Sequence, residues 1–244
     1  MGDPLAPLLD LADVRAAVAS ARDRADAAMR HRALRRQGGQ VAAEVSLRSA
    51  VASAALEGYA HEREAVRAGT VTDPVVQGAL RVAGALGGLA ERWSGAPRQV
   101  LARVHVLAAR ELVDEASLGR PTAPGPRLDA LMHLVSGGTQ VSPLVLAAVV
   151  HGELLALRPF AGPSGVVARA AARLTLIASG FDPRGLLAVE VGHLAREPEY
   201  VGAANAFATG TPDGLRAWLR HYAQAVEVAA EELEEVAAAT APVS

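Results

Sequence analysis

Apolar and polar residues recur along almost the whole chain with the period of an α-helix, and few stretches alternate as a strand would. The sequence therefore predicts an all-α fold without a real sheet. Helices are expected over residues 8–36, about 41–58, 73–93, 96–114, 127–135, 144–157, 166–179, 184–195, 199–208 and 213–239.

Two of these helices are apolar on nearly every face. The first, residues 144–157, follows a Ser142-Pro143 pair that is typical of a helix start, and the second, residues 166–179, ends at a glycine. A helix without a polar face belongs in the middle of a bundle, because its whole surface gains from burial. The two helices and the loop between them, residues 158–165, are therefore predicted to form a central buried hairpin.

The first 40 residues differ from the rest because the helix expected at 8–36 carries many charges. Gly38 and Gly39 follow this helix and are expected to break it. We accordingly divide the chain into an N-terminal amphipathic helix, residues 1–40, and one compact helical domain, residues 41–240.

Composition narrows the class of function. The 244 residues, 51% of them hydrophobic, are enough to bury a substantial core. The 24 basic residues, all of them arginine, face 26 acidic residues, so there is no strong positive field to gather nucleic acid. The absence of cysteine excludes disulfides, thiolate metal sites and cysteine nucleophiles.

The sequence shows neither an export signal nor a membrane helix. Asp3, Asp10 and Asp13 stand where a signal peptide needs a basic start and an apolar run. The longest stretch without charged residues, 130–152, is interrupted by polar residues, glycines and a proline. We therefore expect a cytoplasmic protein that binds neither nucleic acid nor membranes, and the oligomeric state stays open.

The loop at 158–165 is the one candidate for an active site. The helix after it begins with unpaired backbone amides and the positive end of the helix dipole, which favour an anion such as phosphate. Ser164 is a suitable N-cap for this helix. Arg169 lies further along the same apolar helix, where burial of its charge requires a carboxylate or phosphate partner.

Here the sequence resembles a known family. The stretch Arg158-Pro159-Phe160-Ala161-Gly162-Pro163-Ser164-Gly165, followed by Arg169, is similar to the motif HPFx[D/E]GNGRxxR of the Fic (Fido) fold. Ser53-Ala54-Ala55-Leu56-Glu57-Gly58 resembles the family's inhibitory-helix motif, [S/T]xxxE[G/N]. Tyr200, the turn at 210–214 and Trp218 resemble its C-terminal pattern. The resemblance covers about residues 41–226 and implies a Fic-like helical bundle with an inhibitory helix at 41–58.

The resemblance also implies roles for particular residues. Most Fic enzymes move AMP from ATP to a protein hydroxyl, and their motif holds the nucleotide phosphates and a magnesium ion. The residues that match phosphate-binding positions are Phe160, Ser164, Gly165 and Arg169, and those that match the inhibitory motif are Ser53, Glu57 and Gly58. Glu57 and Arg169 are expected to form a buried or half-buried ion pair.

Several groups that the family's chemistry needs are missing. Arg158 stands in place of the catalytic histidine, and a guanidinium that stays protonated cannot accept a proton. Gly162 replaces the acidic magnesium ligand, Pro163 removes a backbone donor from the phosphate cradle, and Val166 replaces the first motif arginine. ATP stays a candidate ligand, and the residues give no support for magnesium or another metal.

The segment that should correspond to the family's target-docking flap, Leu118 to Arg127, is short and rich in proline. A segment of this kind is poorly suited to aligning an extended substrate by strand addition.

Three histidines are candidates for a chemical role. His151 lies two helical turns before Arg158 and is a candidate substitute base, although a core histidine held by a hydrogen bond is the preferred interpretation. His105 and His133 have no metal-ligand spacing with neighbouring acids, so both are interpreted as structural or surface residues.

Three functions follow as hypotheses. The leading one is a Fic-like pseudoenzyme that binds a nucleotide or a partner protein without transferring AMP. The second is a divergent Fic enzyme that transfers AMP or another phosphate-linked group to protein hydroxyls with a different base. The third is a structural helical interaction module. The sequence does not name the partner.

Overall fold

The computed structural model of the protein describes residues 2–122 and 125–240. Met1 and, in the proline-rich loop, Ala123 and Pro124 lie outside the described residues, as do residues 241–244. The described residues form α-helices and short helical turns without a strand, which confirms the all-α prediction. In chain order the elements are η1 (Ala6–Asp10), α1 (Val14–Met29), η2 (Arg32–Arg35), α2 (Gly38–Ala55), α3 (Arg63–Arg67), α4 (Pro74–Trp93), α5 (Pro97–Ala109), α6 (Pro126–His133), η3 (Leu134–Gly138), α7 (Pro143–Leu157), α8 (Ser164–Ala178), α9 (Val189–Ala195), α10 (Glu197–Ala208) and α11 (Pro212–Thr240).

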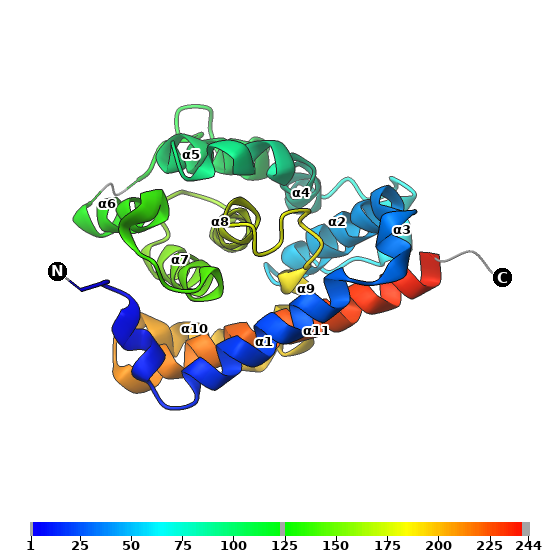
Figure 1. Cartoon of the computed structure of the whole chain (residues 1–244). Helices are drawn as coiled ribbons and strands as arrows, with labels where there is room; N and C mark the ends of the chain where they lie inside the picture. The colour runs from blue at the N-terminus through cyan, green and yellow to red at the C-terminus, as the bar shows by residue number, and fades with distance from the viewer. Residues whose placement is uncertain (1, 123–124, 241–244) are drawn as a thin grey trace.

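Helices α7 and α8 form the predicted hairpin at the centre of the molecule. Figure 1 shows α8 nearly end-on in the middle, with α4 and α5 on one side, and α1, α10 and α11 on the other. Twelve of the fifteen residues of α8 are buried. The helices that lack a polar face therefore lie where their pattern placed them.

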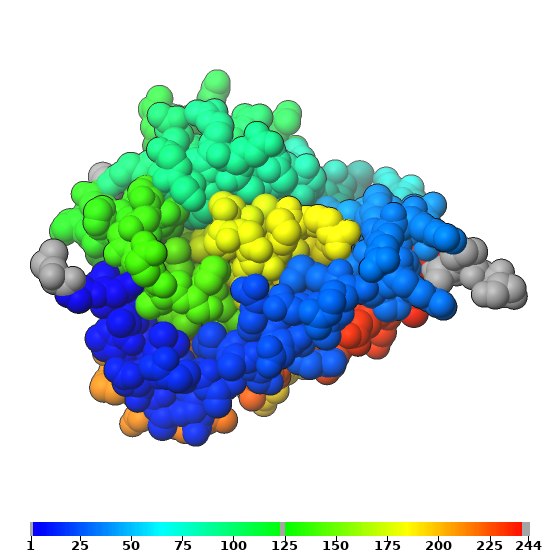
Figure 2. Space-filling model, in the orientation of Figure 1, coloured from blue at the N-terminus to red at the C-terminus, as the bar shows by residue number. Residues whose placement is uncertain are grey.

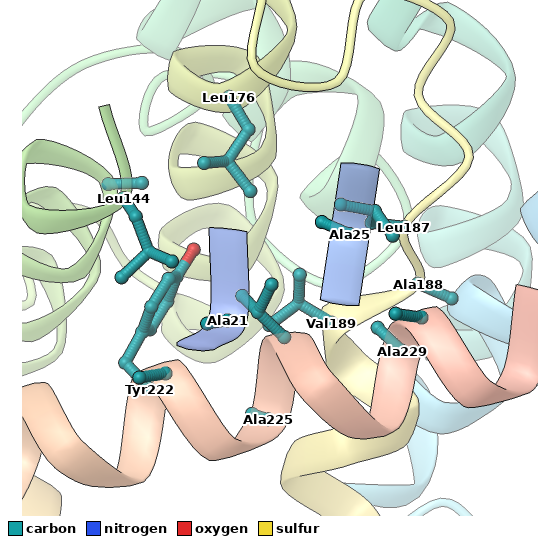
Figure 3. Close-up of a cluster of buried hydrophobic side chains, with 14 of the residues drawn as sticks. Ala21, Ala25, Leu144, Leu176, Leu187, Ala188, Val189, Tyr222, Ala225 and Ala229 are labelled. Carbon is teal, nitrogen blue, oxygen red and sulfur yellow. The ribbon is translucent and has the colours of Figure 1, made fainter. Parts of the chain in front are cut away.

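Two clusters of buried apolar side chains pack against this hairpin from different sides. The first joins α1, α9, α10 and α11 to the start of α7 and the end of α8. In this cluster Leu144 of α7, Leu176 of α8 and Tyr222 of α11 converge (Figure 3). The second joins α4, α5 and α6 to the opposite halves of the same two helices. The hairpin is thus the shared wall of both cores.

Each side of the hairpin also receives a buried tryptophan. The Trp93 indole N–H, at the end of α4, donates to Oγ1 of Thr175 in α8 at 3.0 Å. The Trp218 indole N–H, in α11, donates to the backbone carbonyl of Ala148 in α7 at 2.7 Å. A buried indole needs such a partner, so these two bonds fix how α4 and α11 sit against the centre.

The predicted helix boundaries agree closely at some ends and shift at others. Asp73 caps α4 as expected, because its carboxylate accepts hydrogen bonds from the N–H groups of Val75 and Val76. Helix α5 ends at Ala109, earlier than predicted. The short helix α3 was not predicted, since five residues are too few to show a helical period.

The prediction of one continuous helix over residues 8–36 is wrong. Asp13 has a left-handed backbone, with φ 64°, and this conformation separates η1 from α1. His31 is extended and separates α1 from η2. The predicted break at Gly38 and Gly39 is instead the first turn of α2. Helix α1 packs along α11 and contributes to the first core cluster.

The segment that joins α8 to α9 closes one face of the molecule. It is yellow in Figure 2 and fills the centre of that view, between α5 and α1. The carboxylate of Asp182 shapes this segment by accepting the N–H groups of Leu186 and Leu187, each at 2.8 Å. Within the part of the chain that the structure describes, no helix has the length and apolar character to cross a membrane.

Candidate functional site

A hollow of about 390 Å³ opens beside the loop between α7 and α8. Three parts of the chain that are far apart in sequence form it: the end of α2, the loop with the ends of α7 and α8, and α10. Its polar lining consists of Glu57, Arg158, Ser164, Arg169, Tyr200 and Asn205. Its apolar lining includes Leu155, Val201 and Ala204.

The loop begins at a left-handed residue. Arg158 ends α7 with φ 44° and ψ 57°, and its N–H donates to the carbonyl of Leu154. A positive φ is uncommon in a residue with a side chain and ends the helix sharply here. The Arg158 side chain is exposed and lines the hollow.

The backbone of the loop offers fewer donors to an anion than a glycine-rich cradle would. Pro163 has no N–H, and the Ser164 N–H donates to the Gly162 carbonyl at 2.8 Å. The prediction that Ser164 caps α8 is wrong: Pro163 is the N-cap, and the Ser164 hydroxyl faces the carbonyls of Phe160 and Gly162. The proline set the start of the helix one residue earlier than the serine indicated.

Gly162 has a backbone conformation that favours glycine. Its φ is +81°, and a Cβ at this position would lie 3.2 Å from Cγ1 of Val113, after α5. The loop therefore packs closely against the segment after α5 at the position where the motif has its acidic residue.

Arg169 is 3% exposed, yet partners surround its guanidinium. Its Nε donates to the Ser53 hydroxyl at 3.0 Å, and its Nη2 donates to the Ser53 carbonyl and to Oε1 of Glu57, both at 2.8 Å. Its Nη1 donates to the Tyr200 hydroxyl at 3.2 Å. The predicted ion pair between Glu57 and Arg169 is confirmed, with side chains 21% and 2% exposed respectively.

The environment of Arg169 keeps it charged. Burial by itself lowers the pKa of this guanidinium, but Tyr200 and Glu57 raise it by more, so the pKa lies above its ordinary value. The guanidinium is thus a permanent positive charge at the inner end of the hollow.

Gly165 allows the Glu57 carboxylate to approach the start of α8. A Cβ at this position would lie 2.0 Å from Oε1 of Glu57 and 2.7 Å from Nη1 of Arg169. No side chain fits there, so the carboxylate sits against the backbone of the first helical turn. Helix α2 ends at Ala55, and Gly58, with φ +90°, turns the chain directly after Glu57.

A second buried arginine repeats the contact between α8 and α2 one turn further on. Arg173 donates to the Ser49 hydroxyl at 2.6 Å and to the Gly185 carbonyl at 2.7 Å, and it lies 3.9 Å from Glu190. Ser49 and Ser53 are four residues apart on α2, as Arg169 and Arg173 are on α8, so each pair lies on one helix face. The two arginines fix the register of the two helices.

His151 lies behind the hollow and not in it. It is fully buried, and its Nε2 is 3.0 Å from the Tyr200 hydroxyl, whose oxygen also accepts from Arg169. Burial, together with the charge of Arg169, holds the pKa of His151 well below its usual range. This geometry is that of a neutral core histidine with a hydrogen bond.

Two further histidines continue this buried aromatic layer. His193 of α9 and His221 of α11 are joined by a 3.0 Å hydrogen bond between Nδ1 and Nε2, and both rings pack near Tyr200. Burial lowers the pKa of His193 well below its usual range and that of His221 to about 4. All three imidazoles are therefore neutral in the folded protein at neutral pH.

Phe160 and His105 hold the loop from beneath. Phe160 is 5% exposed, does not line the hollow and stacks on the His105 ring with centroids 4.6 Å apart. The His105 ring also contacts the Ala161 carbonyl and accepts the Gly119 N–H. Thr122 adds a bond from its N–H to the Pro159 carbonyl at 2.8 Å. The flap segment up to Thr122 is thus fastened directly to the loop.

The chain has structural relatives among solved proteins. A Fic family protein from Desulfovibrio desulfuricans G20 has a TM-score of 0.70 and 24% identity, over 93% of this chain and 76% of that one. A fragment of Fic-1 from C. elegans has a TM-score of 0.71 and 18% identity, over 96% of this chain and 76% of that one. A variant of that fragment with one glutamate replaced by glycine has a TM-score of 0.72 and 20% identity, over 94% of this chain and 74% of that one.

The chain has the Fic fold. Each of these matches covers more than nine tenths of this chain at a TM-score of 0.70 or above. Neither a scan against models of protein families nor a search of curated proteins finds a match. The Fic fold is therefore shared although the sequence has diverged.

Within the Fic fold, the other expected residues are placed as follows. Val166, at the position of the first motif arginine, is 2% exposed and belongs to the second core cluster. His133 is exposed at the end of α6. Among residues 2–122 and 125–240, no three His, Asp or Glu side chains converge in a way that could hold a metal ion.

Sequence reasoning missed several groups that this Fic fold brings together. Tyr200 was noted only as part of a C-terminal pattern, and His193, His221 and Asn205 carried no signal. Ser49 and Arg173 have the same spacing as Ser53 and Arg169, and this repeat is the one clue that was available in the sequence.

We predict that Glu57→Gln destabilises the protein by up to about 3 kcal/mol, because it leaves the buried Arg169 charge with neutral partners. The side chain of Glu57 is partly exposed, which reduces the cost. Urea unfolding measures the change. The matched control is Glu64→Gln, which breaks an exposed Arg–Glu pair and should have a much smaller effect. Equal effects of the two substitutions would show that the Glu57 pair is not special.

We also predict that stability falls as the pH is lowered from about 7 to about 5. The unfolded chain binds protons at His151, His193 and His221 below about pH 6.5, whereas the folded protein does not, so protonation favours unfolding. The three groups together give at most about 4 kcal/mol per pH unit. Burial raises the pKa of Asp182, so protonation of this carboxyl group favours the folded protein at lower pH. Urea midpoints that stay constant over this range would contradict the prediction.

Proposed function

We propose that this protein is a Fic-fold pseudoenzyme, which acts by binding a nucleotide or a partner protein in the hollow and does not transfer AMP. The observation that carries the proposal is that partners within the protein already bind the guanidinium of Arg169. The one guanidinium that survives from the motif is held by Ser53, Glu57 and Tyr200, and the Glu57 carboxylate lies against the helix start where an anionic group of a ligand would lie.

The proton acceptor of the reaction is the first group that the hollow lacks. Arg158 stands at the histidine position, and its guanidinium cannot act as a base at any working pH. No imidazole lines the hollow among the described residues. His151 is fully buried, and Tyr200 separates it from the hollow. A general base alone contributes roughly 10²- to 10⁴-fold to such a reaction.

A magnesium–nucleotide complex does not fit the residues that are present. Among the described residues that line the hollow, Glu57 is the one carboxylate, and it is paired with Arg169. Gly162 offers no oxygen ligand from a side chain, and the Ser164 N–H is already directed at Gly162. Hard divalent cations need several oxygen ligands. The hollow therefore supports metal-independent binding.

The features that support binding are the size and lining of the hollow. A volume of about 390 Å³ is within the usual range for small-molecule sites. One wall is apolar, with Leu155, Val201 and Ala204, and the exposed Arg158 stands at the rim with Asn205. An apolar wall with a free guanidinium suits a ligand that has a flat apolar part and an anionic group.

One observation favours the second candidate, a divergent enzyme. Tyr200 lines the hollow, and its hydroxyl contacts both His151 and Arg169. In such an enzyme, His151 would replace the missing base and act through Tyr200. The structural interaction module is the third candidate and would bind no nucleotide at all.

We predict that the protein, given labelled ATP and magnesium, labels neither itself nor a lysate. Titration with ATP should give the same affinity with and without magnesium, because no free carboxylate lines the hollow. Affinity that requires magnesium would favour the enzyme, and no binding would favour partner binding or the structural module. Labelling that survives Arg158→Ala and vanishes on His151→Ala would overturn the proposal and make His151 the base.

We predict that restoring the motif restores part of the activity, measured as self-labelling. The restored protein carries Glu57→Gly, Arg158→His, Gly162→Asp, Pro163→Gly, Ser164→Asn and Val166→Arg. Because Val166 is buried in the second cluster, a second version leaves this residue unchanged. Asp is among the residues that tolerate the left-handed backbone at 162.

The matched control for the restored protein contains every substitution except Arg158→His. Labelling by the restored protein and none by this control would show that the missing base limits the reaction. If both proteins fold, bind no ATP and label nothing, the loop is only a connection between helices, and the pseudoenzyme proposal fails.

A further inference from the structure

A second hollow, of about 450 Å³, lies between α10 and α11. Helix α10 forms a wall of both hollows. The residues of α10 that face the first hollow include Val201, Ala204, Asn205 and Ala208, and those that face the second include Glu199, Gly202, Ala203 and Ala206. Each set follows the spacing of one helix face, so the two hollows lie on two stripes of the same helix.

The lining of the second hollow is positively charged. Arg196, Arg216 and Arg220 line it, with Glu199 as the one carboxylate among the described lining residues. Arg196 pairs with Glu199, whereas Arg216 and Arg220 share Asp13, at 2.8 and 3.8 Å. Three guanidinium groups thus face two carboxylates, which leaves a surplus of one positive charge. These side chains are partly exposed, so the charge is accessible from solvent.

A buried imidazole at the inner wall lacks a partner. The His221 ring lines the hollow, and the residue is 4% exposed. Its Nε2 contacts His193, while its Nδ1 has no hydrogen-bond partner in the described parts of the chain. Nδ1 is itself buried, and a buried polar nitrogen without a partner is costly; a ligand in the hollow that reached this atom would reduce the cost.

We propose that the second hollow is a binding site for a small phosphate-bearing molecule, with its oxyanion held by Arg196, Arg216 and Arg220 beside His221. One guanidinium group can donate to two phosphate oxygens at once, and it keeps its charge at every working pH. Its volume is within the usual range for small-molecule sites. None of the described residues that line this site also lines the first hollow.

The position of the site also gives it a route to the first hollow. The Tyr200 ring lies 5.7 Å from the His221 ring and 4.6 Å from the His193 ring, measured between centroids. The hydroxyl of the same tyrosine is one of the groups that hold Arg169. An anion that reorients His221 therefore acts on a direct neighbour of the Glu57–Arg169 pair, and coupling between two sites is reciprocal.

Titration of His221 reports occupancy of the site. Burial and, to a smaller extent, the charge of Arg196 lower its pKa while Glu199 raises it, and the net result is a pKa of about 4. His193 of α9, Tyr200 of α10, and Trp218 and Arg220 of α11 are the other groups near this ring. A bound oxyanion adds negative charge beside the imidazole, so it should raise this pKa.

The test follows the histidine side chains of the full protein by NMR during titration with sodium sulfate and, separately, inorganic phosphate. Sodium chloride at the same ionic strength corrects for screening. We expect a saturable change at His221 and an upward shift of its pKa by about one unit. Arg220→Gln and Arg196→Gln should each weaken binding roughly tenfold. Arg24→Gln, an equally exposed arginine on α1 paired with Glu231, is the matched control and should change nothing.

Three outcomes would overturn the proposal. His221 signals that respond to sulfate and phosphate no more than to chloride would show that no site exists. Equal weakening by Arg220→Gln and Arg24→Gln would show that the effect is one of net charge. Acetate that binds as tightly as phosphate would show that the hollow recognises carboxylates and not phosphates. His221→Asn, which removes the reporter, should leave calorimetric binding weaker but measurable.

Discussion

The charge of Arg169 inside a buried helix is the constraint on which the rest of the site depends. A guanidinium in an interior of this kind is tolerated only when its hydrogen bonds and its charge are both satisfied. Here α2 supplies Ser53, the turn after α2 supplies Glu57, and α10 supplies Tyr200. Three elements that are far apart in sequence are therefore held in one arrangement. The hollow is the space left between them, and Gly165 keeps that space open to the carboxylate.

The same pairing explains how a Fic fold persists while its motif changes. The contacts of Arg169 stabilise the structure whether or not a nucleotide ever binds. The residues of the loop face a weaker structural demand, because Phe160 on His105 and Thr122 on Pro159 already fix its path. A loop residue such as Arg158, whose side chain is exposed, can then vary without loss of the fold.

Behind the hollow lies a layer of neutral polar rings, which links the two faces of α10. Burial stabilises each of these rings in its neutral form. His151 is hydrogen-bonded to Tyr200 and His193 to His221, and the Tyr200 ring lies close to both rings of the second pair. Rotation of one of these hydrogen-bonded rings would break a bond in a medium where water cannot replace it. Tyr200 is thus a close neighbour both of His221, which lines the second hollow, and of Arg169, which lines the first.

The sequence by itself determined the helical class, the central hairpin and the pairing of Glu57 with Arg169. Periodicity reports burial along a helix, and the resemblance to the Fic family implied that Glu57 pairs with Arg169. The prediction of one continuous helix over residues 8–36 failed because Asp13 has a left-handed backbone. The prediction that Ser164 caps α8 failed because Pro163 is the N-cap. Only the tertiary structure brought His193 to His221 and placed Phe160 beneath the loop. Those contacts join residues from different helices, and a single histidine or phenylalanine has no local pattern that names its partner.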